Sequence, residues 1–581
     1  MNCIMLFIVY LLTFIHFSYC EVKYIEIKAP LKGERSDPGS PWPLPRSWTR
    51  TIATLTLAPD TFELKSAHSK DCDIIEQALL RYRGLIFDQP SSTKISPNHR
   101  ELESMRVTIS DTSCGYPKLG DDEHYTLSIP SYSHGATIKA KTVWGALRAL
   151  ETFSQLVFTK NQDGHNYYLI NATTIEDWPR FSYRGLHIDT ARHFIPVNIL
   201  LKNLEAMAYN KLNVFHWHIS DDQSFPLESK LFPNLTQTGA YSPAHIYRQS
   251  DVRRIISEAR LRGIRVIPEI DTPGHTQSFG KAFPKLLTAC YVGDEPFQAK
   301  YNVHGEAEIL NPSRNYTYQF FKDLFTEIRG LFRDEYIHLG MDEVYPECWE
   351  SNPEIREFMN LQNLRTMTEL EQYYARRTIA TAKQIGYKYM IWQDPLDKGV
   401  QVSNDTIVQV WKSSDEKRNW QDDVRSIARK RHQVIVSSCW YLNKISYGPD
   451  WIEYYKCDPR SFEGSLDEKE YVIGGEACMW TEYVDQTNIL SRIWPRASAV
   501  AERLWSHPRD TNSTDDAQFR LDEHRCRMLR RGIPAQPIGP GFCGPYDLTS
   551  NANSIISSQN QLIVLMCSLL VITRINFRAI F

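Results

Sequence analysis

The sequence lacks the features that would connect it with nucleic acid. Its 66 basic and 69 acidic residues give a net charge of −3 with histidine neutral, and it has no basic tract that could follow a phosphate backbone. It also has no internal repeat. Hydrophobic residues at 42% and charged residues at 23% are ordinary for a soluble globular protein. We therefore expect no nucleic-acid partner.

Two cofactor motifs are also missing. No C-x-x-C occurs, which argues against a zinc knuckle or a redox dithiol. No G-x-G-x-x-G follows a predicted strand, so there is no phosphate-binding loop of the kind found in open, doubly wound sheets. We accordingly predict no metal and no cofactor, and the doubly wound sheet is only the second choice for the fold.

Apolar runs occur at the two ends of the chain, and each has a targeting interpretation. Residues 1–20 have the apolar core and the end expected of a secretory signal peptide. Residues 562–572 are too few for a membrane-spanning helix of about 20 residues. With the small residues at 550–554, this tail (546–581) resembles a signal for a glycolipid (GPI) anchor. Contact with a membrane is expected only through such an anchor.

Other signs of the secretory pathway lie between the ends. The chain has 12 cysteines, and those outside the terminal apolar segments can form disulfides in an oxidising compartment. Asn-X-Ser/Thr sequons without a middle proline occur at Asn171, Asn234, Asn315, Asn404 and Asn512. We expect a glycosylated protein.

The sequence pattern changes at about residue 179. Residues 21–178 hold a proline-rich segment and then strand-like and helical pieces, which predicts a smaller α+β accessory domain. In residues 179–545 strand-type runs alternate with amphipathic helical stretches, the pattern of a parallel α/β fold. Eight predicted strands favour a closed (β/α)8 TIM barrel; they lie near 183–189, 212–219, 264–270, 336–341, 387–392, 406–411, 433–439 and 472–480.

Polar and aromatic residues follow the predicted strands, at the end of a barrel where active sites lie. The fourth strand ends in Asp342-Glu343, and carboxylates rarely end a buried strand without a partner or a task. We predict that both are catalytic; the alternative is that they cap the next helix. Neighbours on a regular strand point oppositely, so both can share a site only if the strand ends or bulges there.

Two kinds of chemistry fit these strand ends. His216 and His218 share one face of a strand and, with His275 and Asp342, could bind a metal as in an amidohydrolase. That class expects such a histidine pair on its first strand, whereas this pair lies on the second. The other interpretation is glycoside hydrolysis, in which paired carboxylates act on a sugar ring that stacks on tryptophan.

Six ordered motifs resemble the family 20 glycoside hydrolases, and within them the animal lysosomal β-N-acetylhexosaminidases. They are RGLHIDT (184–190), HWH (216–218) with DD (221–222), DTPGH (271–275), GMDE (340–343), WYLN (440–443) and GEACMW (475–480). The resemblance covers residues from about 40 to 545. It implies an exo-β-N-acetylhexosaminidase that removes terminal N-acetylglucosamine or N-acetylgalactosamine from glycoconjugates.

The resemblance implies a retaining mechanism in which the substrate supplies the nucleophile. The 2-acetamido oxygen attacks the anomeric carbon and forms an oxazolinium ion. Glu343 is then the general acid and base, Asp342 orients the acetamido group and offsets its charge, and Tyr441 donates a hydrogen bond to its oxygen. An inactive sugar-binding protein on the same fold is the alternative.

The resemblance also implies residues that bind the sugar. Arg184 and Glu482 would hold its outer hydroxyls. Asn443, followed by Lys444, would lie near its 6-position and tolerate a sulphate there. The other implied residues are Trp480 as the floor under the ring, Trp392, Trp411 and Trp440 as walls of the acetamido pocket, and Asp221 and His275 as a proton network beside the acid.

Further expectations come from the same resemblance. The implied assembly is a homodimer or a heterodimer with a related subunit, acting on glycan N-acetylhexosaminides that include 6-sulphated and glycolipid forms. The implied location is the lysosome, with secretion or a GPI-anchored cell-surface form as the alternative. Disulfides are expected between Cys72 and Cys114, Cys290 and Cys348, and Cys526 and Cys543, with Cys439, Cys457 and Cys478 free.

Overall fold

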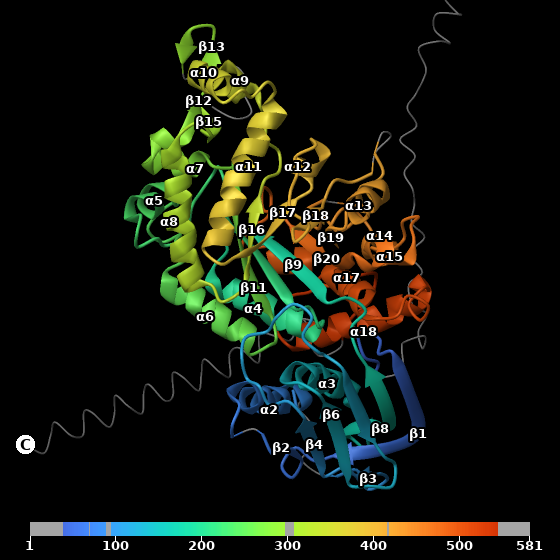
Figure 1. Ribbon diagram of the computed structural model, residues 1–581. Coiled ribbons are helices and arrows are strands. Elements are labelled where there is room, and N and C mark those ends of the chain that lie inside the picture. Colours follow the sequence, from blue (N-terminus) through green and yellow to red (C-terminus); the bar gives the residue numbers. More distant parts are fainter. Residues whose placement is uncertain are drawn as a thin grey trace, which may run out of the picture.

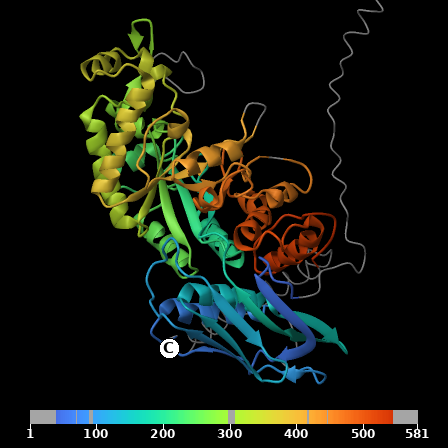
Figure 2. The ribbon, with the colours of Figure 1, turned by 45° about the vertical axis from the view of Figure 1, so that its right-hand side comes forward.

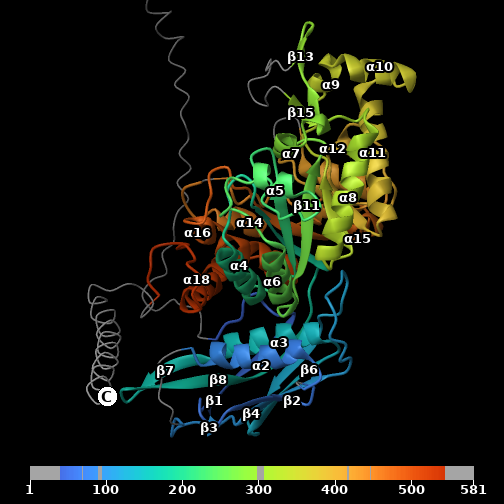
Figure 3. The ribbon, with the colours of Figure 1, turned by 90° about the vertical axis from the view of Figure 1, so that its left-hand side faces the viewer.

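A computed structural model describes residues 39–68, 70–88, 95–296, 307–414, 418–444 and 446–543. A smaller sheet-and-helix unit, blue to teal, lies below a barrel of green to red elements (Figure 1). Figure 2 and Figure 3 show the same two units from other sides. The predicted signal peptide and C-terminal tail lie outside the described residues, and within the described part no helix has the length and apolar character needed to cross a membrane.

The N-terminal unit is a mixed sheet with two helices on one face. Helices α2 (Asp73–Ile86) and α3 (Val143–Leu156) lie between the sheet and the barrel (Figure 3). The Arg148 guanidinium on α3 donates to the backbone carbonyl of Gly263 (2.9 Å), which ties the two units together. The sheet order is β2-β4-β6-β5-β8-β1-β3 with β7 paired to β8; the strands are β1 (Ser47–Leu57), β2 (Glu63–Ser66), β3 (Arg100–Glu101), β4 (Ser104–Ile109), β5 (Tyr125–Ile129), β6 (Gly135–Ala140), β7 (Phe158–Gln162) and β8 (His165–Asp177).

The second unit is a closed barrel of parallel strands, which confirms the predicted TIM barrel. Each of the eight predicted strands is present, with ends that differ by up to three residues. The barrel strands are β9 (Tyr183–Asp189), β10 (Val214–Ser220), β11 (Arg265–Thr272), β16 (Tyr336–Gly340), β17 (Lys388–Trp392), β18 (Ile407–Val410), β19 (Gln433–Val436) and β20 (Val472–Met479). Helices outside it include α4 (Val197–Tyr209), α6 (Gln249–Arg260), α8 (Asn315–Leu331), α11 (Met367–Gln384), α13 (Trp420–Arg429), α17 (Arg496–Trp505) and α18 (Thr514–Arg530).

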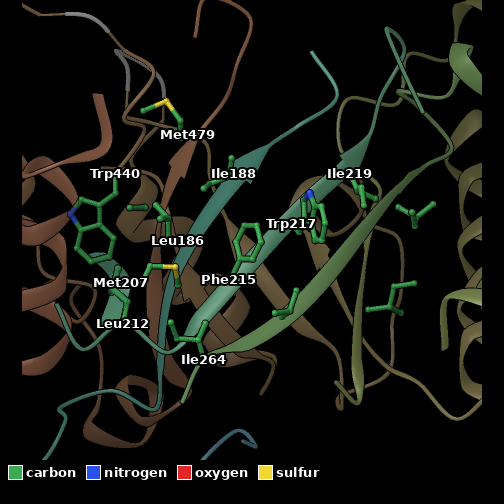
Figure 4. Packing of buried hydrophobic residues seen from close by; sticks show 14 of the residues in the cluster. Leu186, Ile188, Met207, Leu212, Phe215, Trp217, Ile219, Ile264, Trp440 and Met479 are labelled. Carbon is green, nitrogen blue, oxygen red and sulfur yellow. The ribbon is translucent and has the colours of Figure 1, made fainter. Parts of the chain in front are cut away.

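Alternation along the strands separates an apolar outer core from a polar interior. Leu186 on β9 and Phe215 and Trp217 on β10 pack in the layer between strands and helices (Figure 4). The residues between them, such as His187 and His216, are fully buried inside the barrel. This period of two follows from strand geometry, and it allows a wall of apolar side chains to enclose titratable groups.

The end of the barrel nearer the accessory domain is closed by an apolar layer. It consists of Tyr183, Val214, Ile267, Tyr336, Met390, Ile407 and Ile435. Each of these residues begins its strand or lies two positions after its start. The opposite end, where the strands finish, is the one that can hold a site.

Four disulfides are present among the described residues. The three predicted pairs, Cys72–Cys114, Cys290–Cys348 and Cys526–Cys543, are confirmed. Cys478 is free and buried, as expected. The prediction that Cys439 and Cys457 are free is wrong, because they are linked to each other. Cys457 directly follows α14 (Trp451–Lys456), which folds back on the loop after β19 and brings the two Cα atoms to 6.5 Å.

Candidate active site

The carboxylate pair lies on a loop that begins where β16 ends. The strand stops at Gly340, and Gly340, Met341 and Glu343 have φ values of 65°, 71° and 47°. A side chain at Gly340 would collide with the Asp271 carboxylate, which in turn accepts a hydrogen bond from the Met341 N–H (3.2 Å). The left-handed turns break the alternation of the strand, so Asp342 and Glu343 can both serve the mouth of the barrel.

An imidazole stands between this pair and the barrel interior. His275 Nε2 lies 3.5 Å from Glu343 Oε2 and 3.8 Å from Asp342 Oδ2, and its Nδ1 lies 3.2 Å from Asp221 Oδ1. Burial disfavours the charged ring, but the Asp221 carboxylate outweighs it and raises the pKa of His275 well above its usual value. The hydrogen bond from His275 lowers the pKa of Glu343, whereas burial raises the pKa of Asp342 to about 7. The two carboxylates therefore differ in acidity.

The histidines of the barrel interior lie against other carboxylates than Asp342. His216 Nδ1 is 2.8 Å from Glu476, and His218 lies between Glu269 (2.9 Å) and Asp221 (2.8 Å). Several groups that contain histidine have ligand atoms within 4.8 Å of one another and could hold a cation. The groups His187, His218 and Glu269, and His216, Glu269 and His338, are fully buried and cannot offer a metal to a substrate at the mouth. Asp221, Asp222 and His275 form a further group, which is partly exposed.

Aromatic side chains from four strand ends form one cluster beside the carboxylates. Trp392 and Trp480 pack together with Cys478, and Trp411 and Tyr441 pack against them. The rings of Trp411 and Tyr441 are stacked, with centroids 6.1 Å apart. Burial raises the pKa of Tyr441 well above 10, so its hydroxyl keeps the proton that it would donate.

The structure places Trp440 away from this cluster, so its prediction as a pocket wall is wrong. The backbone around it pairs with β20, because Cys478 N–H donates to Trp440 O and Leu442 N–H donates to Cys478 O. Adjacent residues of such a segment face opposite sides. Tyr441 therefore faces the site, while the fully buried Trp440 lies in the outer core (Figure 4) and donates its indole N–H to Tyr454 O (2.9 Å).

Arg184 is also not at the mouth, which corrects the predicted sugar anchor. It is the second residue of β9, and about 16 Å of extended strand separates it from Asp189 at the other end. Its guanidinium is fully buried and donates to both carboxylate oxygens of Glu123 (2.7 Å each) in the accessory domain. The physical reason is register: a residue at the start of a barrel strand lies at the end opposite the site.

Arg192, which follows the C-terminal end of β9, occupies the position predicted for Arg184. It pairs with Asp189 (3.1 Å) and Asp221 (2.9 Å), and its guanidinium lies 4.9 Å from the centre of the Trp480 ring. Its Nη1 is 4.0 Å from Glu482 Oε1, so the predicted partner Glu482 is at the mouth. The sequence signal for Arg192 is its place in the segment DTARH (189–193), directly after the predicted first strand.

Asn443 and Lys444 lie just beyond Tyr441. The side chain of Asn443 is half-buried, and its Oδ1 has no hydrogen-bond partner among the described residues. Lys444 is exposed, with its Nζ 5.8 Å from the centre of the Tyr441 ring and 3.3 Å from Ser413 Oγ. Both residues are therefore at the rim of the site.

Two carboxylates of unequal acidity beside an aromatic pocket can cleave a glycosidic bond by acid–base catalysis. The geometry thus places the protein among the glycoside hydrolases. A family model for the glycosyl hydrolase family 20 catalytic domain matches residues 181–508, and a second model, described as beta-acetyl hexosaminidase like, matches residues 41–156. The chain belongs to glycosyl hydrolase family 20.

Similar proteins agree with this assignment. The beta-hexosaminidase subunit beta of Homo sapiens is 45% identical over 513 residues, which cover 86% of this chain and 89% of that protein. The subunit alpha of Bos taurus is 44% identical over 513 residues, or 86% of this chain and 94% of that protein. The solved structure of a chitobiase from Flavobacterium johnsoniae has a TM-score of 0.71 at 31% identity, covering 85% of this chain and 73% of that one.

Proposed function

We propose that this enzyme removes terminal N-acetylhexosamine residues from glycoconjugates by a retaining, substrate-assisted reaction. The acetamido oxygen of the substrate attacks the anomeric carbon while Glu343 protonates the departing oxygen. Glu343 then takes a proton from the water that opens the oxazolinium ion. Asp342 accepts a hydrogen bond from the acetamido N–H and offsets the positive charge, and Tyr441 holds the acetamido oxygen for attack.

The observation that carries this proposal is the position of Asp342 beside the Trp411–Tyr441 stack. Asp342 Oδ1 is buried and has no hydrogen-bond partner among the described residues, and the charge of Asp342 adds to the raised pKa of Tyr441. A buried acceptor without a donor is costly. An acetamido N–H of the substrate would satisfy it.

The acidities of the pair fit such a reaction at mildly acid pH. At pH values between the lowered pKa of Glu343 and the pKa of about 7 of Asp342, the two carboxyl groups together hold one proton. The productive arrangement has the proton on Glu343 and the charge on Asp342. Donation from the acetamido N–H favours the ionised form of Asp342 and thereby shifts the proton to Glu343.

Substrate contacts and cellular setting extend this proposal. Arg192 and Glu482 bind outer hydroxyls, Trp480 supports the ring, and Asn443 with Lys444 accepts a 6-sulphate. The chain acts in the lysosome, having entered the secretory pathway, and pairs with itself or with a related subunit. The similarity to alpha and beta subunits supports a dimer, and the mildly acid pH expected for the carboxylate pair fits the lysosome.

Hydrolysis of an aryl β-N-acetylglucosaminide at acid pH is the test. The proposal predicts turnover that EDTA leaves unchanged. Folded protein that binds the sugar without cleaving it would favour the inactive binding protein, and loss of activity in EDTA would favour the amidohydrolase-like alternative.

A further inference from the structure

We propose that Asp394 is a positioning residue, which joins the loop that carries Glu343 to the wall of the acetamido pocket. Asp394 begins α12 (Asp394–Asp397), two residues beyond the end of β17, and is only 4% exposed. The inference rests on the roles proposed above for Asp342, Glu343 and Trp411.

The Asp394 carboxylate contacts two different parts of the site. Its Oδ2 accepts the indole N–H of Trp411 (2.7 Å), and its Oδ1 lies 3.4 Å from the backbone N–H of Glu343. The Lys412 ammonium stands 3.0 Å from Oδ1 and supplies the counter-charge. A single buried side chain thus orients both a pocket wall and the backbone of the acid.

Both contacts act where the orientation of a side chain has to be held. Glu343 has a left-handed φ of 47°, a conformation that other residues must stabilise when the residue is not glycine. The next carbonyl, Val344 O, accepts a hydrogen bond (2.7 Å) from Lys398 at the end of the same short helix. Trp411 in turn stacks on Tyr441, so a rotated indole would disturb the hydroxyl that holds the acetamido oxygen.

Asp394 also acts on Asp342 through its charge. Burial is the main cause of the raised pKa of Asp342; the imidazole of His275 opposes it and the charge of Asp394 adds to it, together with Glu269 and Glu343. Around Asp394 itself stand Lys412 after β18, the carboxylates of the β16 loop, Glu371 on α11 and Tyr441 after β19. Removing the charge of Asp394 should therefore lower the pKa of Asp342, and removing Lys412 should raise it.

The experiment is the pH profile of kcat/KM for an aryl β-N-acetylglucosaminide. The proton that Asp342 and Glu343 share is lost at the pKa of Asp342, about 7, so in the unaltered enzyme the alkaline limb should lie near this pH. Asp394→Asn keeps an acceptor for the Trp411 indole but removes the charge, so this limb should move about half to one unit toward acid. Asp394→Ala also removes the acceptor and should lower kcat about tenfold or more, because a buried indole N–H is left unpaired.

Asp397→Asn is the matched control. Asp397 lies on the same helix and pairs with the same Lys412 (2.7 Å) and with Arg418 (2.7 Å). Among the described residues, its hydrogen bonds and ion pairs do not include Trp411 or Glu343. The control should leave the alkaline limb within a few tenths of a unit. If the alkaline limb moved equally far in Asp397→Asn, the shift would follow from the loss of any charge on α12, and the inference would be overturned.

Lys412→Met keeps the inference testable if Asp394→Asn does not fold. In Lys412→Met the alkaline limb of the pH profile should move toward alkaline pH, opposite to the shift in Asp394→Asn. An unmoved limb in Asp394→Asn or in Lys412→Met would refute the role of Asp394 and leave the proposed function standing. No hydrolysis by the folded, unaltered enzyme would refute the proposed function itself.

Discussion

The two ends of the barrel carry the same kinds of charged residue, but at one end these residues pair with one another and at the other end some polar atoms have no protein partner in the described part of the chain. At the end nearer the accessory domain, Arg184 pairs with Glu123 at 2.7 Å and Arg265 with Asp334 at 2.7 Å, and all four side chains are at most 5% exposed. At the mouth, Asp342 and Asn443 keep acceptors without a partner among the described residues, and Glu343 is 39% exposed. Buried charges that pair with one another contribute to stability, whereas acceptors and charges without a protein partner can bind a ligand.

The largest effect should come from the exposed acid at the mouth. Glu343→Gln should lower kcat by a factor of about 10² to 10⁴, the usual contribution of general acid–base catalysis. The loss should shrink for a substrate with a good leaving group, which needs less protonation. Comparing two aryl glycosides checks this; the same loss on both would show that Glu343 is not the acid.

Asp342→Asn should be the next most severe change. We expect kcat to fall by about 10² to 10³, with a smaller change in KM, because the charge that Asp342 offsets develops during the reaction. Steady-state kinetics on the same substrate give both constants. A rise in KM at unchanged kcat would instead assign Asp342 to ground-state binding.

Replacing one arginine at each end of the barrel tests whether one end serves stability and the other binds the substrate. Arg184→Met should lower the free energy of unfolding by about 3 kcal/mol or more, because it removes one partner of a buried pair, while KM of the folded enzyme stays unchanged. Arg192→Met should lower kcat/KM about 10- to 100-fold through lost hydrogen bonds to the sugar. Denaturant unfolding and kinetics on both variants measure this. A sugar-binding defect in the Arg184 variant would erase the distinction between the two ends.

The smallest effect is expected at the rim. The double change Asn443→Asp and Lys444→Leu replaces a neutral residue and a cation with an anion and an apolar group. It should reduce kcat/KM for a 6-sulphated N-acetylglucosaminide about five- to tenfold relative to the neutral sugar. Equal losses of kcat/KM on both substrates would contradict a role of these two residues in binding the 6-sulphate. So would an unaltered enzyme that does not hydrolyse the sulphated substrate.

Much of the architecture was predictable because it depends on repeating patterns. The alternation of strand and helix predicted all eight barrel strands, and the rule that sites follow strand ends predicted that Asp342 and Glu343 lie at the mouth, while the family resemblance added Tyr441. Arg184 was misplaced because the same motif spans a whole strand, and its first and last residues lie at opposite ends of the barrel. Arg192, after the strand, was the residue at the mouth.

Other features depend on local geometry that a sequence pattern does not reveal. Trp440 and Tyr441 are adjacent, and only the pairing with β20 decides which of them faces the site. The Cys439–Cys457 link requires α14 to fold back on the loop after β19. Asp394 was visible at a strand end, but its link between Trp411 and Glu343 needs three segments to be placed together.

Inhibition by a thiazoline analogue of the oxazolinium ion tests the central claim most directly. The cyclic intermediate requires Asp342 and Tyr441 to hold the acetamido group, so the analogue should compete with substrate and bind far more tightly than N-acetylglucosamine. A parallel glycoside with a free amine in place of the acetamide should be almost inert. Failure of the thiazoline to bind, together with tight binding of a plain sugar lactone, would contradict substrate-assisted hydrolysis at this mouth.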